Sequence, residues 1–505
     1  MAAQHHVPRF FLEEELWQRW RSRCSAAYES VLGQSLEQYE QGPATGAIEQ
    51  SPAAEVLFLH RLSTHPRRTS NAAEASLIVV PALLGLNVRG YCGSELDNVD
   101  ELARHLLGSH WFRRSLGADH VLLTTDWLAL RSIKLLANAG LMGRLCFACQ
   151  SSVVLHAWNG APRKWMPHVR ILAAPLVVAQ PVKPPLPWRG RNVTLFFAGQ
   201  THGAGVSYMP RRKLVKIAAR DFRVPNVVYS TSLWATNPEA RACRSGNCYM
   251  QPCVDSYMSG GCVASRNQST MKAMTRRLQG SQYNLAWPGD HGEAAVSSRI
   301  YDGFAQGALN VFLGSRIIEQ SPPVRRRLTS RSGPNMRAQR LTARPYLMPR
   351  RETAPFRNEL PWLNMSVIVP PRNFSTAPAR TIEGAVADAE KRDGGKWLER
   401  ALSLIARHAA DLLWHHPRSR VANRILRGCQ RSMVPGIPPR GIQAPSLASW
   451  KEQLAIARQE QGRRKELVSN KLAAARPDHG AHKARKKEQL AISQQEPGHK
   501  KIVAH

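Results

Sequence analysis

The stretch SQYNLAWPGDHGEAAVSSRIYDGFAQGALNVFL, residues 281–313, contains a strand, a turn, a helix and a second strand. The apolar run that ends at Trp287 predicts the first strand, and PGD at 288–290 predicts the turn. Ser297 and Ser298 stand where a helix N-cap belongs, and the helix should end near Gly307, before the next apolar run. Such units build α/β domains.

The same alternation of strands and helices continues towards the N-terminus. Continuous apolar strands separated by helices are typical of a parallel sheet covered on both faces. After a Pro-rich linker, residues 180–190, the alternation of strands and helices begins again. We therefore expect two Rossmann-like α/β domains facing each other across a cleft, with ligands at the carboxyl ends of the strands. The strands expected in the first domain are SLIVVPAL (76–83), DHVLLTTDWLAL (119–130), LCFAC (145–149) and VRILAAPLVV (169–178).

Changes in composition along the chain set the predicted boundaries. The predicted parts are a helical or loose segment (1–53), a first α/β domain (54–185), a second α/β domain (186–430) with an Arg-rich insertion (319–358), and a basic tail expected to be disordered (431–505). The tail carries KEQLAI twice, which also fits a solvated helix. The longest apolar run, residues 76–86, is far short of the roughly 20 residues that cross a membrane. The N-terminus shows no signal-peptide core.

The chain is strongly basic, with 70 Lys and Arg against 36 Asp and Glu and a formal net charge of +34. This excess favours polyanionic partners such as nucleic acid, anionic membranes, acidic glycans or nucleotide phosphates. Much of it lies in residues 316–357 and in the tail, where solvated basic segments explain it equally well. Because no zinc-finger, RRM or KH signature occurs, nucleic acid is not expected as a partner. A basic polyanion-binding protein is the alternative from another functional class.

Cysteines and glycosylation sequons bear on the compartment. Four of the nine cysteines lie within residues 243–262, at spacings unlike those of a zinc ribbon or finger, so disulfides, free thiols and a zinc site all stay open. Cys146 and Cys149, in the apolar run LCFAC, are expected to be core residues rather than redox-active ones. Four sequons favour the secretory lumen, at Asn192, Asn267, Asn364 and Asn373.

The unit at 281–313 is suited to binding a nucleotide diphosphate. A helix N-terminus offers N–H donors and a favourable dipole to phosphates, and the hydroxyls of Ser297 and Ser298 add donors. Arg299 can contact the diphosphate with two N–H groups. Asp302 lies three residues further on the same helix face and can accept hydrogen bonds from ribose hydroxyls. The structural alternative is an ordinary capped helix with an Arg–Asp ion pair.

The same unit resembles the exostosin family, glycosyltransferase family 47, whose signature is approximately F-x-L-x-P-x-G-D, a gap, S-x-R-x-x-D-A, and G-C-I-P-V. Further similarity extends over roughly residues 55–426, in HPRRTSNAAEASLIVVPAL, HWFRRSLGADHVLLTTDW, RNVTLFFAG with the later Arg211-x-x-Leu214, and LPWLNMSVIVPP. The chain departs from the signature at Asn284, at Gly303 and at ALNV (308–311), which replaces C-I-P-V. The matching residues, in order, are Tyr283, Leu285, Pro288, Gly289, Asp290, Ser297, Arg299, Asp302 and Gly307.

The resemblance implies a GT-B fold and transfer of a sugar from a nucleotide sugar, commonly a UDP-sugar, to a glycan or glycoprotein, with inversion. Arg299, the helix N-terminus and Arg211 are then expected to stabilise the leaving diphosphate. This arrangement needs no divalent metal, and no D-x-D motif is evident. Gly289 and Asp290 belong to the same donor-binding segment, and no further cofactor is expected.

A catalytic base is required to deprotonate the acceptor hydroxyl. The candidates are Asp119 and His120, in the first domain (54–185), and Glu293, in the loop before the helix of the donor-binding segment. The first domain is expected to be the acceptor-side domain, and the second (186–430) the nucleotide-sugar-binding domain. The family resemblance places the protein in the Golgi or another secretory-pathway lumen, although the anchor helix usual in the family is not seen here. Because of the departures from the signature, a catalytically degenerate member that binds only glycan or nucleotide stays open.

Overall fold

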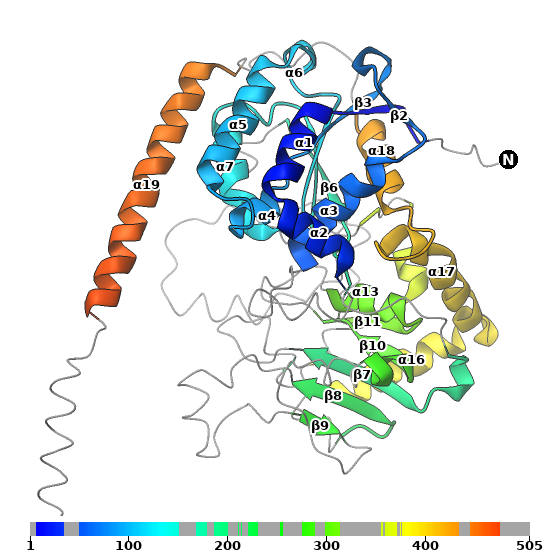
Figure 1. Ribbon diagram of the computed structural model, residues 1–505. Coiled ribbons are helices and arrows are strands. Elements are labelled where there is room, and N and C mark those ends of the chain that lie inside the picture. Colours follow the sequence, from blue (N-terminus) through cyan, green and yellow to red (C-terminus); the bar gives the residue numbers. More distant parts are fainter. Residues whose placement is uncertain are drawn as a thin grey trace, which may run out of the picture. The chain divides into compact units, whose positions relative to one another are not determined.

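Figure 1 shows the computed structural model of the chain. The structure describes residues 7–34, 50–150, 168–178, 186–199, 211, 214, 221–230, 253–255, 275–287, 298–313, 355–356, 359–370, 374, 376–433 and 445–474. Its residues up to Leu447 form one compact unit that contains two β-sheets, and a second unit begins at Ala448.

The first sheet has six parallel strands in the order β2-β1-β3-β4-β5-β6. Strands β3, β4 and β5 are buried along their whole length, as continuous apolar runs predict for a sheet covered on both faces. The predicted first α/β domain is thus confirmed. The strands are β1 (Phe10–Leu12), β2 (Arg68–Thr69), β3 (Leu77–Val80), β4 (His120–Thr124), β5 (Cys146–Gln150) and β6 (Arg170–Ala174).

Seven helices accompany the first sheet in the described part of the chain. The segment before residue 54, predicted to be helical or loose, holds two of them and also supplies β1, which lies between β2 and β3. A strand of three residues is too short to show a sequence period. A disulfide joins Cys24, between the first two helices, to Cys92. The helices are α1 (Glu14–Arg23), α2 (Ser25–Gly33), α3 (Gln50–Ser63), α4 (Leu84–Val88), α5 (Glu95–Gly108), α6 (His110–Ser115) and α7 (Leu130–Asn138).

The second sheet has the order β12-β11-β10-β7-β8-β9, and only β9 runs antiparallel to its neighbour. The predicted strand–helix–strand unit at 281–313 is confirmed as β10, α13 and β11. With the first sheet, it makes the α/β pair expected of a GT-B type fold. The elements are β7 (Val193–Gly199), β8 (Asn226–Ser230), β9 (Cys253–Asp255), β10 (Ser281–Leu285), α13 (Ser298–Ala305), β11 (Leu309–Leu313) and β12 (Ser366–Val369).

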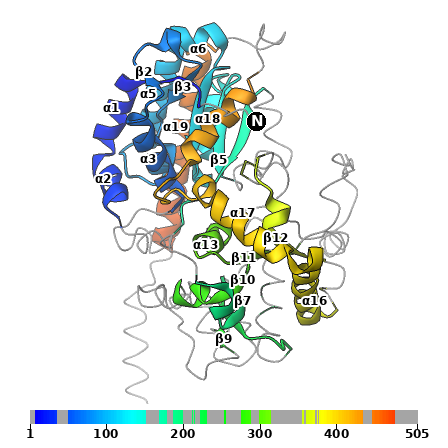
Figure 2. The same cartoon turned by 90° about the vertical axis from the view of Figure 1, so that its right-hand side faces the viewer.

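Two helices of the second domain follow β12 in the chain. Helix α16 (Pro378–Lys391) packs on β12, and α17 (Trp397–Leu412) packs on the 3-10 helix η8 (Trp362–Met365), as Figure 2 shows. Helix α17 buries Trp397, Ala401 and Ile405 along one face, which is the spacing of an amphipathic helix. The two helices also pack on each other and cover the β12 end of the sheet.

Helix α18 (Val421–Arg431), which was predicted to belong to the second domain, packs on β6 of the first sheet and on α3. Its buried face carries Cys429, which forms a disulfide with Cys146 of β5. The carbonyl oxygen of Cys429 also accepts a hydrogen bond from Arg170 Nη1 at 3.1 Å. The LCFAC segment is therefore a buried strand, as predicted, but one of its cysteines is a cross-link. Cys149 is a buried free thiol.

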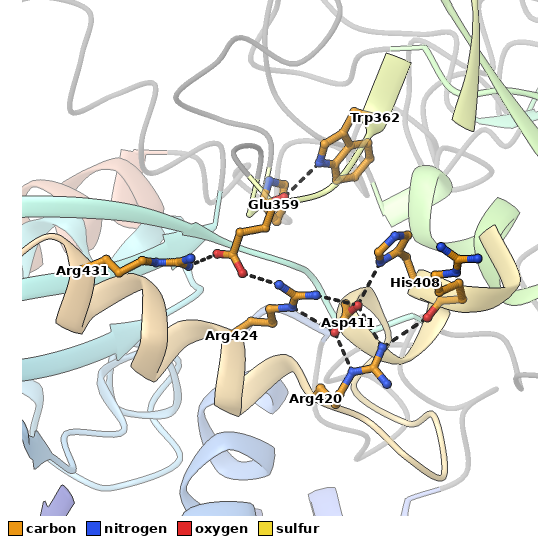
Figure 3. Close-up of polar contacts among 9 residues, drawn as sticks. Glu359, Trp362, His408, Asp411, Arg420, Arg424 and Arg431 are labelled. Atoms are coloured by element: carbon orange, nitrogen blue, oxygen red, sulfur yellow. Dashed lines mark hydrogen bonds and ion pairs between the residues drawn. The ribbon is translucent and has the colours of Figure 1, made fainter. Parts of the chain in front are cut away.

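A charged network joins α17, α18 and the segment before η8 (Figure 3). The buried Asp411 accepts hydrogen bonds from His408 at 3.0 Å, from Arg420 at 2.8 and 3.0 Å, and from Arg424 at 3.0 Å with two nitrogens. Arg424 also contacts Glu359. One carboxylate thus binds side chains of α17, of the residue before α18 and of α18 itself.

The tail contains a long helix. Helix α19 (Leu447–Ala474) includes the first KEQLAI copy, whereas the second lies outside the described residues. Lys, Glu, Gln, Ala and Leu favour helix formation without tertiary packing, so such a composition can be helical as well as disordered. Most of the Arg-rich insertion and of the cysteine cluster also lies outside the described residues. None of the described helices is long and apolar enough to span a membrane.

Candidate active site

Two arginines that were predicted to hold a diphosphate lie at the carboxyl edge of the second sheet. Arg299, in the first turn of α13, donates from Nε to the carbonyl oxygen of Ala198 near the end of β7, and its guanidinium lies 5.7 Å from the ring centre of Phe197. Arg211 is buried and donates from Nη2 to the carbonyl oxygen of Trp287, beyond β10, at 3.1 Å. Because β7 and β10 are neighbouring parallel strands, both guanidinium groups lie at the edge where α/β sheets bind ligands.

The electrostatics of this edge favour an anion. Burial lowers the pKa of Arg211 well below its ordinary value, and the positive charge of Arg299 lowers it further. Like charges that repel each other in a desolvated site are stabilised when an anion binds between or beside them. The two arginines therefore form a cationic site suited to a diphosphate.

The remaining predicted donor residues are placed in part. Asp302, one turn after Arg299 in α13, is buried. Ser298 begins α13, but its side chain, like Gly289, Asp290, Glu293 and Ser297, lies outside the described residues. In the described residues no cluster of three His, Cys, Asp or Glu side chains can hold a metal ion, and the expectation of a metal-free site stays a prediction.

The backbone conformation of Gly307 explains why a glycine stands at this position of the family signature. Its φ of 65° lies in the left-handed region, where glycine carries no steric cost. The backbone N–H of Ala308 donates to the carbonyl of Gly303 at 2.8 Å, and that of Gly307 donates to the carbonyl of Phe304 at 3.2 Å. This pair of bonds is a Schellman motif, which ends α13 and leads into β11.

Three residues that differ from the family signature, Asn284, Gly303 and Asn310, lie next to one another where α13 packs on β10 and β11. Asn284 Nδ2 donates to Asn310 Oδ1 at 2.8 Å and to the carbonyl of Arg299 at 2.7 Å, and Asn310 Nδ2 donates to the carbonyl of Ile300 at 3.0 Å. Both asparagines are buried. A Cβ on Gly303 would lie 2.5 Å from Asn310 Oδ1 and 2.7 Å from Asn284 Nδ2. The three substitutions are thus one packing arrangement that ties the first turn of α13 to β10 and β11.

Gly303→Ala is expected to destabilise the protein by about 1–3 kcal/mol, because its methyl group overlaps two buried, hydrogen-bonded amides. In an Asn284→Ala, Asn310→Ala background, the same change should be neutral or stabilising, because alanine favours helix by up to ~1 kcal/mol over glycine. Chemical unfolding of the four proteins measures this coupling. Gly384→Ala in α16, where nothing lies near the added methyl, is the control that should stabilise. Equal effects of Gly303→Ala in both backgrounds would rule out the coupling.

Asp119 and His120, two of the predicted bases, lie at the amino end of β4. Asp119 Oδ1 accepts from Ser115 Oγ at 2.6 Å and pairs with His120 Nδ1 at 2.7 Å, and its Oδ2 accepts from Arg114 at 3.0 Å. Burial alone raises the pKa of Asp119, but these hydrogen bonds hold it well below its usual range. A carboxylate with so low a pKa is a weak base.

The position of His120 also argues against a role as the catalytic base. Its side chain is fully buried and packs edge-on against Phe112, with ring centres 5.3 Å apart. Ligands of α/β sheets bind at the carboxyl ends of the strands, and β4 begins at His120. The geometry therefore favours a structural role for both residues, in fixing the turn between α6 and β4. It brings neither residue together with Arg299.

The carboxyl ends of β3 and β4 carry two other carboxyl groups that the sequence analysis did not select. Glu55, buried in α3, accepts from the backbone N–H of Gly85 at 2.9 and 3.0 Å, from that of Thr125 at 3.2 Å, and from the Thr124 hydroxyl. Asp126 pairs with Arg89 Nε at 2.6 Å. These contacts hold the two loops that follow β3 and β4.

Burial raises the pKa of Glu55 to about 8 and outweighs the hydrogen bonds from Thr124 and Gly85, while the charge of Asp126 raises it further. Gly85 must be glycine to come so close, because a Cβ there would lie 2.7 Å from Glu55 Oε1. Asp126 lies in the quoted segment HWFRRSLGADHVLLTTDW, and the direction of the predicted strand would have pointed to it rather than to Asp119.

Comparison with known proteins found a relative with a named activity. The chain is 24 % identical over 310 residues to a protein of Arabidopsis thaliana named as a probable xyloglucan galactosyltransferase, GT17. The aligned region covers 58 % of this chain and 58 % of that protein, so the chain matches little more than half of its relative's length. No family model matches the chain.

Proposed function

We propose that this protein is an exostosin-type glycosyltransferase that moves a sugar from a nucleotide sugar, a UDP-sugar, to a hydroxyl of a glycan or glycoprotein. The observation that carries the proposal is the pair Arg211 and Arg299 at the carboxyl edge of β7 and β10. The similarity to a galactosyltransferase supports it independently.

In the proposed reaction the acceptor oxygen forms a bond to the anomeric carbon of the sugar, while the bond from that carbon to the diphosphate oxygen breaks. Negative charge then grows on the diphosphate, where Arg299, Arg211 and the N-terminus of α13 stabilise it. Asp302 is suited to the ribose hydroxyls. Attack opposite the leaving group inverts the anomeric centre. Since Asp119 and His120 lie at the amino end of β4, Glu293 is the base that we propose.

Galactose is the first donor sugar to test, because the similar plant protein is named as a galactosyltransferase. Xyloglucan, which the same name contains, is the first acceptor to test. The described disulfides, Cys24–Cys92 and Cys146–Cys429, support an oxidising compartment, which agrees with the secretory-pathway lumen.

The test is UDP release by the full chain from a panel of UDP-sugars with xyloglucan oligosaccharides present, beside a direct measurement of UDP binding. We expect release with one donor, UDP-galactose, and an acceptor-dependent rate. UDP binding without release from any donor would replace the transferase with the degenerate, nucleotide-binding alternative. Absence of both binding and release would refute the proposed function.

A further inference from the structure

Two of the four sequons have their asparagine in the described part of the chain, and both side chains are exposed. Asn192 directly precedes β7, and Asn364 lies in η8 directly before β12. The two residues that follow Asn364 in its sequon, Met365 and Ser366, are fully buried. The fold therefore leaves both asparagines exposed, whereas Met365 and Ser366 lie in the core.

An exposed leucine accompanies each of these asparagines. Leu363, next to Asn364, is 40 % exposed. Leu186 is 43 % exposed, and its carbonyl oxygen accepts a hydrogen bond at 3.2 Å from Nε of Arg191, the residue directly before Asn192. Outside α19, these two leucines are the exposed large hydrophobic side chains of the described residues. Each sequon is thus next to apolar surface that a bulky polar group would cover.

Both positions lie away from the arginine site. Strands β7, β10, β11 and β12 are parallel, so the residues that precede β7 and β12 lie at the amino edge of the sheet, whereas Arg211 and Arg299 lie at its carboxyl edge. Strand β12 is also the outermost strand of its sheet. A glycan at Asn364 would hinder pairing of that edge with another chain while leaving the candidate active site open.

From these observations we propose that Asn364 and Asn192 each carry an N-linked glycan that covers the neighbouring leucine. The donor class is an oligosaccharide linked to a lipid diphosphate. A bond forms between Asn Nδ2 and the anomeric carbon of the terminal sugar. The bond from that carbon to the diphosphate breaks, the lipid diphosphate leaves with the electron pair, and Nδ2 loses one proton. The host's transferase catalyses this step on the nascent chain, so burial of Ser366 in the finished fold does not prevent it.

The buried hydroxyl of Ser366 makes a clean control possible. Its Oγ makes no hydrogen bond within the described residues, so Ser366→Ala removes the sequon without removing a contact of the fold or changing Asn364. Ser366→Thr keeps the sequon. Asn364→Gln and Asn192→Gln remove the acceptor nitrogens themselves.

The experiment is to express the full chain with an added secretory leader in a eukaryotic host and to map asparagine occupancy by mass spectrometry after enzymatic deglycosylation. We expect occupancy at both sites, loss at Asn364 in Asn364→Gln and Ser366→Ala, and retention in Ser366→Thr. The Cys146–Cys429 peptide in the same digest reports that the chain has folded. Unmodified Asn364 and Asn192 in disulfide-bonded protein would overturn the inference, and so would a lack of disulfides in the secreted chain. The outcome does not depend on the proposed reaction.

Discussion

Arg299→Ala is expected to lower the rate of sugar transfer by about 10²–10³-fold, because it removes the charged donor that we propose stabilises the leaving diphosphate. UDP affinity should fall as well, while the affinity for uridine, which has no phosphate, should change little. The reason is that Arg299 lies at the carboxyl edge of β7, where its contact with the carbonyl of Ala198 sets its direction. Arg299→Lys should recover only part of the effect, since lysine keeps the charge but loses the planar two-point contact.

The measurement is calorimetric titration of wild type and variants with UDP and with uridine, beside UDP release. Arg276→Ala is the matched control, because Arg276 is an exposed arginine before β10, at the opposite edge of the sheet, and its loss changes the net charge equally. If Arg299→Ala and Arg276→Ala bound UDP as tightly as wild type does, the diphosphate would have to bind elsewhere.

The second large effect is expected for stability, where Asp411→Ala should lower the free energy of unfolding by about 3–5 kcal/mol. The side chain of Asp411 is fully buried, and its removal leaves Arg420 and His408 without their carboxylate partner and Arg424 with Glu359 alone (Figure 3). Urea unfolding followed by tryptophan fluorescence measures the loss. Asp388→Ala, an exposed aspartate of α16, should change stability by less than about 0.5 kcal/mol. Equal effects of the two substitutions would contradict the role of the network.

The same network predicts a dependence on pH. Burial by itself raises the pKa of Asp411, but hydrogen bonds from His408, Arg420 and Arg424 outweigh it and hold that pKa well below its usual range. An acid whose pKa is lowered by folding stabilises the protein above its unfolded pKa, about 4, and loses this contribution as the pH falls further. The stability difference between wild type and Asp411→Asn should therefore be constant near neutral pH and shrink below about pH 4.

The sequence was sufficient to predict the longer strands of both sheets, but not β1, β2 and β9, which have two or three residues each. Apolar runs such as LCFAC and SLIVVPAL are unambiguous because both faces of a parallel sheet are buried. Strand β1 was missed because three residues carry no period, and its pairing depends on β2 and β3, more than fifty residues later in the chain. The position of α18 was missed for a similar reason, since nothing local to it indicates that it packs on β6.

The candidate site was predicted unevenly. Arg299 was selected because a helix N-terminus after a strand is a local motif, and Arg211 because of the family resemblance. The structure brings both to one edge, and their contact with a diphosphate stays a prediction. Asp119 was selected instead of Asp126 without regard to the direction of β4. Asp119 precedes that strand, whereas Asp126 follows it at the carboxyl end, where α/β sheets bind ligands. The Asn284–Asn310 pair could not be anticipated, because the amides meet only when two strands and α13 pack together.

Helix α18 has a consequence for the order in which the protein is made. It packs on β6 and is cross-linked to β5, although roughly half the chain separates Cys146 from Cys429, with a sequence separation of 283. The first domain therefore cannot be completed on the ribosome before nearly the whole second domain has emerged. A gene fragment that stops at the Pro-rich linker encodes an open sheet whose last strand lacks its covering helix. Recombination at the linker would therefore separate the first sheet from the helix that covers it, so the two domains have to be inherited together.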